Sequence, residues 1–239
     1  MTAVPKTAMV LAAGLGTRMR PLTDDRPKAL VEVAGKAMID HLLDRLLAAG
    51  VQTVVVNVHH FADLMQAHLA QRRAPRILIS DERDGLLDSG GGIARAAPLL
   101  GEAPIFVANI DNIWIEGPRP ALQTLAEAWD PQRMDICILL APRDRSTGFE
   151  RPEGFVLDAD GRATHSNSTD PWPPFNNIGV QILKPSVLDG QTGSFSIVPI
   201  WNRLGPEGRL YGAVMEGFDM HVSDPAAREA AEARLAGVR

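Results

Sequence analysis

The chain has 239 residues and a single cysteine, Cys137, which lies in the apolar run 134–140. One cysteine cannot form an intramolecular disulfide, and such a composition is typical of a reducing compartment. We interpret Cys137 as a small buried hydrophobic residue. A fold that depends on internal disulfides is therefore excluded.

Long apolar runs and an excess of basic charge are also missing. No stretch approaches the roughly 20 apolar residues of a membrane span. Near the N-terminus, Gly14 and Arg18 interrupt the apolar run that a secretory signal would need. The formal net charge of −5 does not favour general nucleic-acid binding. We expect a cytoplasmic protein that binds neither nucleic acid nor membrane, and the oligomeric state stays open.

Internal repeats are absent, including the hexapeptide repeats of a β-helix. With 45% hydrophobic and 22% charged residues, the chain can bury one full core, so we expect a single domain over 1–239. Apolar strands alternate with helical patterns in the first half, which predicts an α/β, Rossmann-like, mainly parallel sheet flanked by helices, with no C-terminal β-helix. The expected strands are 8–12, 51–57, 76–80, 105–109 and 136–141, and the expected helices are 37–49, 62–72, 91–100 and 121–129. In the helix 37–49, the leucine-rich face consists of Ile39, Leu42, Leu43, Leu46 and Leu47.

The pattern changes after about residue 142. An Asp-Gly turn signal within 154–161 predicts a hairpin. The polar, proline-bearing stretch 166–174 is interpreted as a loop over the functional site. A strand is expected at 177–184, a short helix at 195–204, and a final helix at 225–235 with Asp224 as its N-cap.

A glycine loop follows the first expected strand and carries unusual positive charge. Gly14 and Gly16 allow close backbone approach, so main-chain N–H groups can face an anion. Arg18, Arg20 and Lys28 add cations beside it. No lysine follows a glycine as in a Walker A loop, and Met19 occupies the position of the third small residue of a dinucleotide fingerprint. The loop therefore predicts binding of a polyphosphate of another kind.

The string Gly14-x-Gly16-Thr17-Arg18-x-x-Pro21, followed by Pro27-Lys28, closely resembles the signature of sugar-1-phosphate nucleotidyltransferases. Within that family the chain is most similar to short bacterial enzymes of cell-wall recycling that act on N-acetylmuramic acid 1-phosphate and UTP. Mannose-1-phosphate guanylyltransferases are the next most similar. The resemblance follows nearly the whole chain and is most specific over residues 9–47.

The resemblance implies that a sugar 1-phosphate oxygen attacks the α-phosphorus of a nucleoside triphosphate and expels pyrophosphate. Such a displacement needs positioning and charge neutralisation, usually by Mg²⁺ with Arg and Lys. By residue match, Arg18 would hold the β- and γ-phosphates, and Lys28 would bridge the α-phosphate and the sugar phosphate. Asp111 follows a buried strand, where open α/β sheets place ligands, and would hold the metal.

The second metal ligand departs from the family pattern. His221 stands where relatives carry an aspartate, and imidazole is a poor ligand for Mg²⁺. Three alternatives remain: His221 faces the metal site, Asp219 substitutes for it from the same side of the strand, or Asp111 and the substrates hold the ion alone. We favour His221 as a site residue.

The resemblance also implies substrate contacts. Nucleotide contacts are expected from the loop and from a glycine segment near the base, namely Leu11, Ala12, Ala13, Gly14, Gly16, Thr17, Arg18, Gly90 and Gly91. Amide and other side chains suited to the sugar 1-phosphate are Lys28, Asn112, Asn176 and Asn177, with Trp114 and Trp172 as further candidates.

Three functions remain open. The first is a Mg²⁺-dependent enzyme that joins UTP and N-acetylmuramic acid 1-phosphate. The second is the same reaction on another pair, such as GTP with mannose 1-phosphate, or on an alcohol phosphate. The third is a non-catalytic nucleotide-sugar sensor, which the His221 departure favours and the joint presence of Arg18, Lys28 and Asp111 disfavours.

Overall fold

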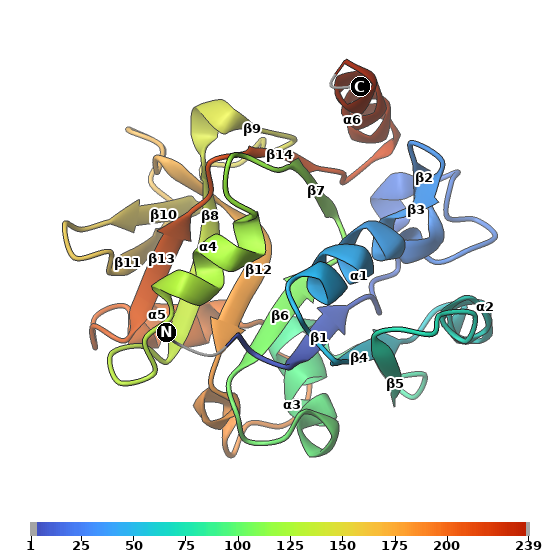
Figure 1. The fold of residues 1–239 in the computed structure, drawn as a ribbon, viewed down its shortest axis with the longest axis horizontal. Coiled ribbons are helices and arrows are strands. Elements are labelled where there is room, and N and C mark those ends of the chain that lie inside the picture. The colour runs from blue at the N-terminus through green and yellow to red at the C-terminus, as the bar shows by residue number, and fades with distance from the viewer. Residues whose placement is uncertain (1–3, 238–239) are drawn as a thin grey trace.

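A nine-stranded mixed sheet forms the centre of the molecule (Figure 1). The computed structural model describes residues 4–237. The strands of the sheet are β1 (Thr7–Leu11), β4 (Thr53–Val58), β5 (Arg76–Asp81), β6 (Ile105–Asn109), β8 (Ile136–Pro142), β10 (Gly154–Leu157), β11 (Ala163–Ser166), β12 (Phe175–Leu183) and β13 (Leu210–Val214). The order β11-β10-β12-β6-β1-β4-β5 forms one path, and β8 pairs with β12 and β13.

The first half of the chain supplies most of the parallel strand pairs of the sheet. Strand β1 pairs in parallel with β4 and β6, and β4 pairs in parallel with β5. Strand β12 then runs antiparallel to both β6 and β8, and β10 and β11 form the predicted hairpin. The expected α/β sheet is confirmed, and its second half is antiparallel except for β13, which pairs in parallel with β8.

Helices cover both faces of the sheet, because neighbouring residues of a strand point to opposite faces. They are α1 (Met38–Ala48), α2 (Ala62–Leu69), α3 (Asp88–Leu100), α4 (Ala121–Ala128), α5 (Val198–Leu204) and α6 (Pro225–Ala236). On β4, Val54 and Val56 pack in the hydrophobic cluster that contains residues of α1, α2 and α4, while Val55 packs in the cluster of α3 and α5. Asp224 caps α6 as predicted, since its carboxylate accepts the N–H of Ala227 at 2.9 Å.

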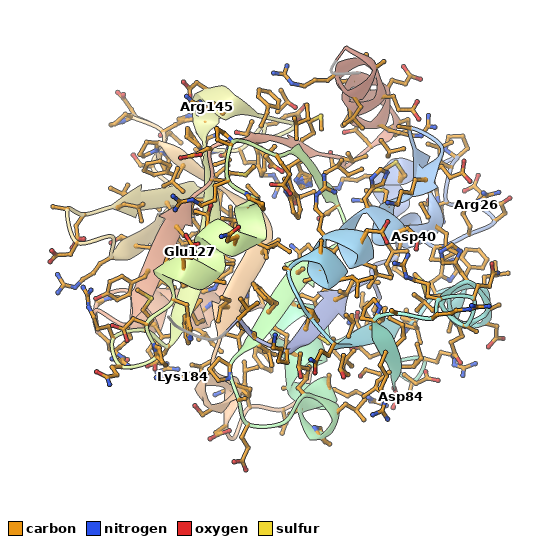
Figure 2. All side chains as sticks on the ribbon, in the orientation of Figure 1. Arg26, Asp40, Asp84, Glu127, Arg145 and Lys184 are labelled. Carbon is orange, nitrogen blue, oxygen red and sulfur yellow. The ribbon has the colours of Figure 1, made fainter. Side chains whose placement is uncertain are left out.

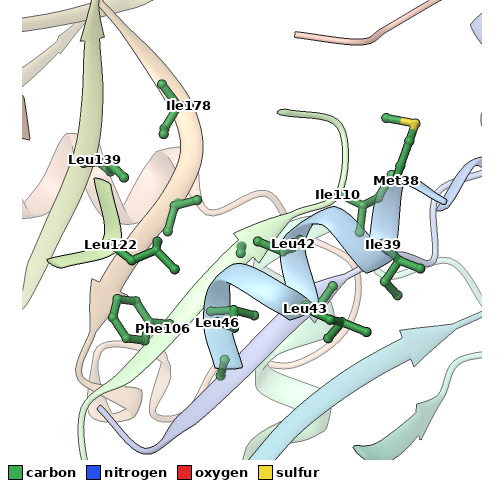
Figure 3. Packing of buried hydrophobic residues seen from close by; sticks show 14 of the residues in the cluster. Met38, Ile39, Leu42, Leu43, Leu46, Phe106, Ile110, Leu122, Leu139 and Ile178 are labelled. Carbon is green, nitrogen blue, oxygen red and sulfur yellow. The ribbon is translucent and has the colours of Figure 1, made fainter. Parts of the chain in front are cut away.

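Helix α1 lies on the sheet through Ile39, Leu42, Leu43 and Leu46 (Figure 3). Each such burial stabilises the fold by about 1.5–3 kcal/mol. Leu47 was expected on this face, but it is 40% exposed. The buried positions follow the i, i+3, i+4, i+7 rule, and Leu47 lies one residue further round the helix.

Two short sheets were not predicted. Strands β7 (Asn112–Ile115), β14 (Phe218–His221) and β9 (Ser146–Thr147) form one. Strands β2 (Glu32–Val33) and β3 (Lys36–Ala37) form a small hairpin. Pairing of β14 with β7 brings a segment near the end of the chain beside residues that follow β6, and this determines the position of His221.

Charged side chains lie around the outside of the fold, as the labelled Arg26 and Asp84 show (Figure 2). Across the described residues, no helix is long and apolar enough to cross a membrane.

Candidate active site

The glycine loop leaves β1 at the carboxyl edge of the parallel strands, and Asn57 at the same edge of β4 holds it. The Asn57 Oδ1 accepts the N–H groups of Ala12 at 2.6 Å and Ala13 at 3.2 Å. Its Nδ2 donates to Glu82 Oε1 at 2.9 Å. Two of the loop N–H groups expected to face an anion are therefore bound within the protein. Sequence reasoning missed Asn57 as a positioning residue, because its role depends on β4 lying next to β1 in the sheet.

The two glycines of the loop differ in what surrounds them. Gly16 has φ +64, and a Cβ there would lie 3.0 Å from the Lys28 Cβ, so a side chain would be strained. A Cβ on Gly14 would meet no described atom within 4 Å, and Gly14 lines a cavity. The packing of the protein therefore gives no reason for a glycine at position 14, whereas a ligand lying against the loop would.

Lys28 and Asp111 form the charged centre of the site. Lys28 lies in a 3₁₀ turn, η2 (Lys28–Leu30), and Asp111 follows β6 directly. The Lys28 Nζ lies 3.1 Å from Asp111 Oδ2, and the two side chains are 11% and 23% exposed. Burial raises the pKa of Asp111, but the charge of Lys28, the charge that His221 carries when it is protonated and the Lys28 hydrogen bond together outweigh it, so the pKa lies below its ordinary value. Asp111 is therefore ionised at neutral pH.

His221 lies next to this pair, as expected. It ends β14 and pairs with Asn112 of β7, so its Nε2 lies 3.6 Å from Asp111 Oδ2. That separation is too long for a hydrogen bond. The Nε2 atom is buried and has no partner among the described residues. Burial lowers the pKa of His221, although the Asp111 charge raises it, so the imidazole is neutral at pH 7.

Asp219 occupies a different environment and does not line the cavities. It is fully buried, and its Oδ2 accepts Asn112 Nδ2 at 2.9 Å. Burial raises the pKa of Asp219 to about 8, so its carboxyl is mostly protonated at neutral pH. Because Asp219 lines neither cavity, its position disfavours the alternative in which it replaces a metal ligand. Within residues 4–237, no group of three or more His, Cys, Asp or Glu side chains could hold a metal ion.

Two cavities meet at the charged centre. The smaller, about 430 Å³, is lined by the glycine loop, Lys28, Asn57, Glu82 and the start of α3. The larger, about 690 Å³, is lined by Arg18, His221, β12 and the segment 148–155. The residues shared by both walls are Leu11, Ser89, Asn109 and Asp111.

The glycine segment of α3 contacts protein. The helix begins at Asp88, three residues earlier than expected, so Gly90 and Gly91 lie inside its first turn. A Cβ on Gly90 would lie 2.4 Å from the Phe195 ring, and one on Gly91 would lie 2.3 Å from the Gly193 carbonyl oxygen. Close packing against 193–195 thus explains both glycines. Ser89, immediately before them, lines both cavities.

Besides Lys28, the three asparagines and Trp114 were expected at the sugar, and they separate into two groups. Asn112 and Asn177 line the larger cavity. Asn176 points to the other side of β12, where it is 1% exposed and donates to Ser146 Oγ. Trp114 is buried, and its indole N–H donates to Glu116 at 2.7 Å. Because side chains alternate along a strand, Asn176 and Asn177 cannot both face the cavity.

The loop that covers the larger cavity is 148–153, and the expected loop 166–174 lines neither cavity. Arg143 holds the covering loop, since its guanidinium donates to the carbonyl oxygens of Arg151 at 3.5 Å and Glu153 at 3.1 Å. It also donates to the Pro173 carbonyl and lies over the Trp172 ring, 4.8 Å from its centroid. Trp172 therefore packs on Arg143 outside the cavity. Gln181 and Trp201, which do line it, were missed.

The arrangement suits transfer between two phosphorylated molecules. Each cavity can take one molecule, and a lysine and a carboxylate lie where the two would touch. A glycine loop at the carboxyl edge of an α/β sheet is typical of nucleotide-binding proteins, so the fold and the site define a protein of that class.

The sequence model of the MobA-like NTP transferase domain matches residues 8–179. The chain belongs to this family of nucleotidyltransferases.

Three relatives extend the comparison over the whole chain. The chain is 57% identical, over 99% of each sequence, to N-acetylmuramate alpha-1-phosphate uridylyltransferase of Caulobacter vibrioides. It is 33% identical to the Neisseria meningitidis protein of the same name, over 96% of this chain and 98% of that one. It is 30% identical to mannose-1-phosphate guanyltransferase beta-B of Xenopus laevis, over 91% of this chain but 61% of that longer protein. The guanylyltransferases are thus the more distant relatives.

The inositol-1-phosphate CTP transferase of T. maritima has the same fold. It superposes with a TM-score of 0.80 at 16% identity, covering 95% of this chain and 93% of that one.

Proposed function

We propose that this enzyme transfers UMP from UTP to N-acetylmuramic acid 1-phosphate, forming UDP-N-acetylmuramic acid and pyrophosphate. The observation that carries the proposal is 57% identity over the full length to an enzyme of that name. The junction of two cavities at Lys28 and Asp111 supports it. We place the activity in the recycling of cell-wall sugars in the cytoplasm, with the two small-molecule substrates as its partners.

The charged residues have separate tasks in this reaction. A phosphate oxygen of the sugar 1-phosphate attacks the α-phosphorus of UTP, and the bond from that phosphorus to the bridging oxygen of pyrophosphate breaks. Lys28, at the junction, neutralises the α-phosphate and the sugar phosphate together. Arg18, in the wall of the larger cavity, stabilises the departing pyrophosphate. These are electrostatic and positioning roles, which dominate phosphoryl transfer.

The junction fits a magnesium ion that takes most of its ligands from the substrates. Mg²⁺ is usually bound by one or two carboxylates plus phosphate oxygens and water, and Asp111 offers one ionised carboxylate. When bound, the ion would neutralise negative charge on the phosphates. His221 is less suited to Mg²⁺, and its neutral ring lies where it can contact a phosphate oxygen.

The smaller cavity is proposed to hold the uridine. Its wall carries Glu82 and the loop residues Leu11, Ala12, Ala13 and Gly14. Glu82 is 1% exposed, and Asn57 fixes one of its carboxylate oxygens. The acceptor oxygens of Glu82 complement the N3–H donor of uracil. Gly16 and Thr17 continue the loop toward Arg18 and the phosphates, and Gly90 and Gly91 support this wall from behind.

The larger cavity is proposed to hold the muramyl sugar. Asn112 and Asn177 can bond sugar hydroxyls, since an amide both donates and accepts. Arg151 of the covering loop also lines this cavity. Muramic acid differs from glucosamine by a lactyl ether that carries a carboxylate, and a guanidinium binds carboxylates well. We therefore assign Arg151 to that group.

Pyrophosphate release across nucleoside triphosphates and sugar 1-phosphates tests the proposal. UTP with N-acetylmuramic acid 1-phosphate should give the fastest release. If GTP with mannose 1-phosphate gives the fastest release, the proposed activity is wrong and the enzyme is a guanylyltransferase, the second function considered above. Folded protein that binds UTP but turns over no pair would favour the non-catalytic sensor.

A matched substitution tests the sugar assignment in the same assay. Arg151→Gln should lower kcat/KM for N-acetylmuramic acid 1-phosphate by about 10-fold or more, the order of a lost charge-assisted hydrogen bond. It should leave N-acetylglucosamine 1-phosphate unaffected, because that sugar lacks the lactyl carboxylate. Arg73→Gln, at an exposed position away from both cavities, is the control. Equal loss for both sugars would remove Arg151 from recognition of the lactyl group.

A further inference from the structure

Gln181 is a buried polar residue in the wall of the larger cavity. It is 6% exposed and lies on the cavity side of β12 with Asn177 and Gly179. The alternate residues of the strand, Ile178 and Val180, are fully buried in the core. A glutamine at such a position has a desolvation cost unless its polar atoms have partners.

The orientation of its amide is fixed by Trp201. The indole Nε1–H of Trp201 donates to Gln181 Oε1 at 3.0 Å. An indole N–H can only donate, so the atom that accepts it must be the amide oxygen. The amide Nε2 has no hydrogen bond to the described residues, and it is not among the enclosed atoms that lack a partner. Its N–H donors are therefore presented to the cavity.

The cavity wall that contains this donor is of mixed polarity, and two apolar residues are tied to it by contacts. Val107 is the strand partner of Gln181, and Phe155 packs edge-on against Trp201 with ring centroids 5.5 Å apart. The hydrophobic residues of the wall are Leu11, Val107, Phe149, Phe155, Ile197, Val198 and Trp201. A ligand group that combines one hydrogen-bond acceptor with a small apolar end complements such a wall. A hydroxyl supplies an acceptor without the apolar end, whereas an acetamido group supplies a carbonyl oxygen and a methyl together.

The position along the sheet agrees with this assignment. Gln181 pairs with Val107, two residues before β6 ends at Asn109. At about 3.3 Å per residue, it lies roughly 7 Å further into the cavity than the edge where Asp111 follows. A sugar whose phosphate lies at Lys28 and Asp111 would direct a ring substituent toward this depth.

We propose that Gln181 is a specificity-determining residue that donates a hydrogen bond to the N-acetyl carbonyl of the sugar, with Trp201 as the residue that positions it. The inference rests on the proposed function for the identity of the sugar. Beyond the proposed function, the inference names the N-acetyl group as the part of the sugar that the inner end of the larger cavity recognises.

The test compares two sugar 1-phosphates that differ only at C2: N-acetylmuramic acid 1-phosphate and its analogue with a hydroxyl in place of the acetamido group. For each, kcat/KM is measured by pyrophosphate release and Kd by calorimetry, for the wild type and for Gln181→Met. The wild type should prefer the acetamido sugar by about 10-fold or more, in the range of one buried hydrogen bond with its apolar contact. In Gln181→Met, which has similar volume but no donor, that preference should fall to within about 2-fold.

Trp201→Phe provides the second variant, because it retains an aromatic ring in contact with Phe155 but frees the Gln181 amide. It should reduce the same preference by a smaller factor, and thermal melting checks that both variants fold. If Gln181→Met does not fold, an unchanged preference in Trp201→Phe overturns the proposal.

The remaining outcomes also support or overturn the role of Gln181. Equal losses for the two sugars, or no loss, would show that Gln181 has only a structural role. A wild type that binds the acetamido sugar preferentially without turnover would contradict the proposed function but support Gln181. A wild type that binds neither sugar would overturn both.

Discussion

Charge at the junction of the two cavities depends on three side chains that lie far apart in the sequence. The ammonium group of Lys28 contacts the carboxylate of Asp111, and the neutral ring of His221 lies next to it. A partly buried ion pair of this kind adds little to stability by itself, since burial costs both groups hydration. Phosphates that enter the site would therefore find the Lys28 ammonium and the Asp111 carboxylate already charged and in place.

Asp111→Asn should therefore lower kcat by at least about 100-fold and change the KM for the nucleotide only a few fold. The carboxylate acts mainly on charge that develops during transfer, so its loss affects the transition state more than the ground state. Steady-state kinetics with purified, folded protein measure both constants. Asp63→Asn, which alters a 90% exposed carboxylate, is the control. A turnover close to that of the wild type would exclude Asp111 from the mechanism.

Residue patterns identified part of this site and missed the rest for a physical reason. Arg18 and Lys28 belong to one recognisable string of residues after β1, and Asp111 comes two residues after β6 ends, so local sequence was enough to find them. Asn57, Gln181 and Arg143 act through partners in other strands or loops, and nothing in the local pattern records those partners. Asn176 shows the same limit, because which of two adjacent amides faces the cavity depends on the register of β12.

Among the strands, β8 is central to the second half of the sheet. One carboxylate, Asp135, ties its start to two other strands. Asp135 accepts hydrogen bonds from Arg209 at 2.8 and 3.0 Å and from Lys184 at 2.8 Å. These residues adjoin the start of β13 and the end of β12. The Arg209 hydrogen bonds, followed by the effect of Lys184, lower the pKa of Asp135 to about 2 although burial raises it.

Asp135→Asn should consequently reduce the free energy of unfolding by about 2 kcal/mol at pH 7, since each pKa unit corresponds to about 1.4 kcal/mol. The folded pKa is below the ordinary value of 3.8, so this stabilisation is complete above about pH 4. It is lost as the pH falls toward 2. Urea unfolding at several pH values should show the difference between variant and wild type shrinking over that range.

Asp84→Asn is the matched control for that series, because its ion pair with Arg95 is exposed and such pairs contribute little. If the difference in unfolding free energy between Asp135→Asn and the wild type does not change with pH, the charge of Asp135 does not stabilise the strands, and its packing and neutral hydrogen bonds do.

The long elements and the β10–β11 hairpin were predictable, whereas the short strands β7, β9 and β14 were not. Helix α1 and strands β1, β4 and β6 have strong apolar periodicity, and their positions were predicted to within two residues. Strands β7 and β14 have four residues each, too few for a period to be visible, and no turn joins them as the Asp-Gly turn joins β10 and β11. Their pairing joins segments more than 100 residues apart, and only the folded chain shows that it places His221 beside Asp111.

At the scale of the whole molecule, the two cavities lie at one edge of a sheet that has a core on each face. The sheet is shared by both cavities, so binding in either should stabilise the same cooperative fold. Strand β1, which precedes the glycine loop, and strand β12 belong to this one sheet, although the glycine loop and β12 line different cavities.

A non-hydrolysable UTP analogue and N-acetylmuramic acid 1-phosphate should each raise the melting temperature, and their effects should add. A ligand at 100 times its Kd stabilises the folded state by about 2.7 kcal/mol. Thermal melting with each ligand alone and with both together measures this. If the sugar phosphate cancels the effect of the nucleotide, the two compete for one cavity, and the proposed arrangement of substrates is wrong.

The wall common to the two cavities, which includes Asp111, has a consequence for what leaves the enzyme. Each substrate occupies one cavity, but the nucleotide sugar that forms from them occupies both as a single tethered molecule. If one half detaches, the other holds it nearby at high effective concentration, so it rebinds readily. A stable mimic that joins uridine to a muramyl sugar through an uncleavable diphosphate would gain the same advantage. Such a bivalent compound is the natural starting point for an inhibitor of this enzyme.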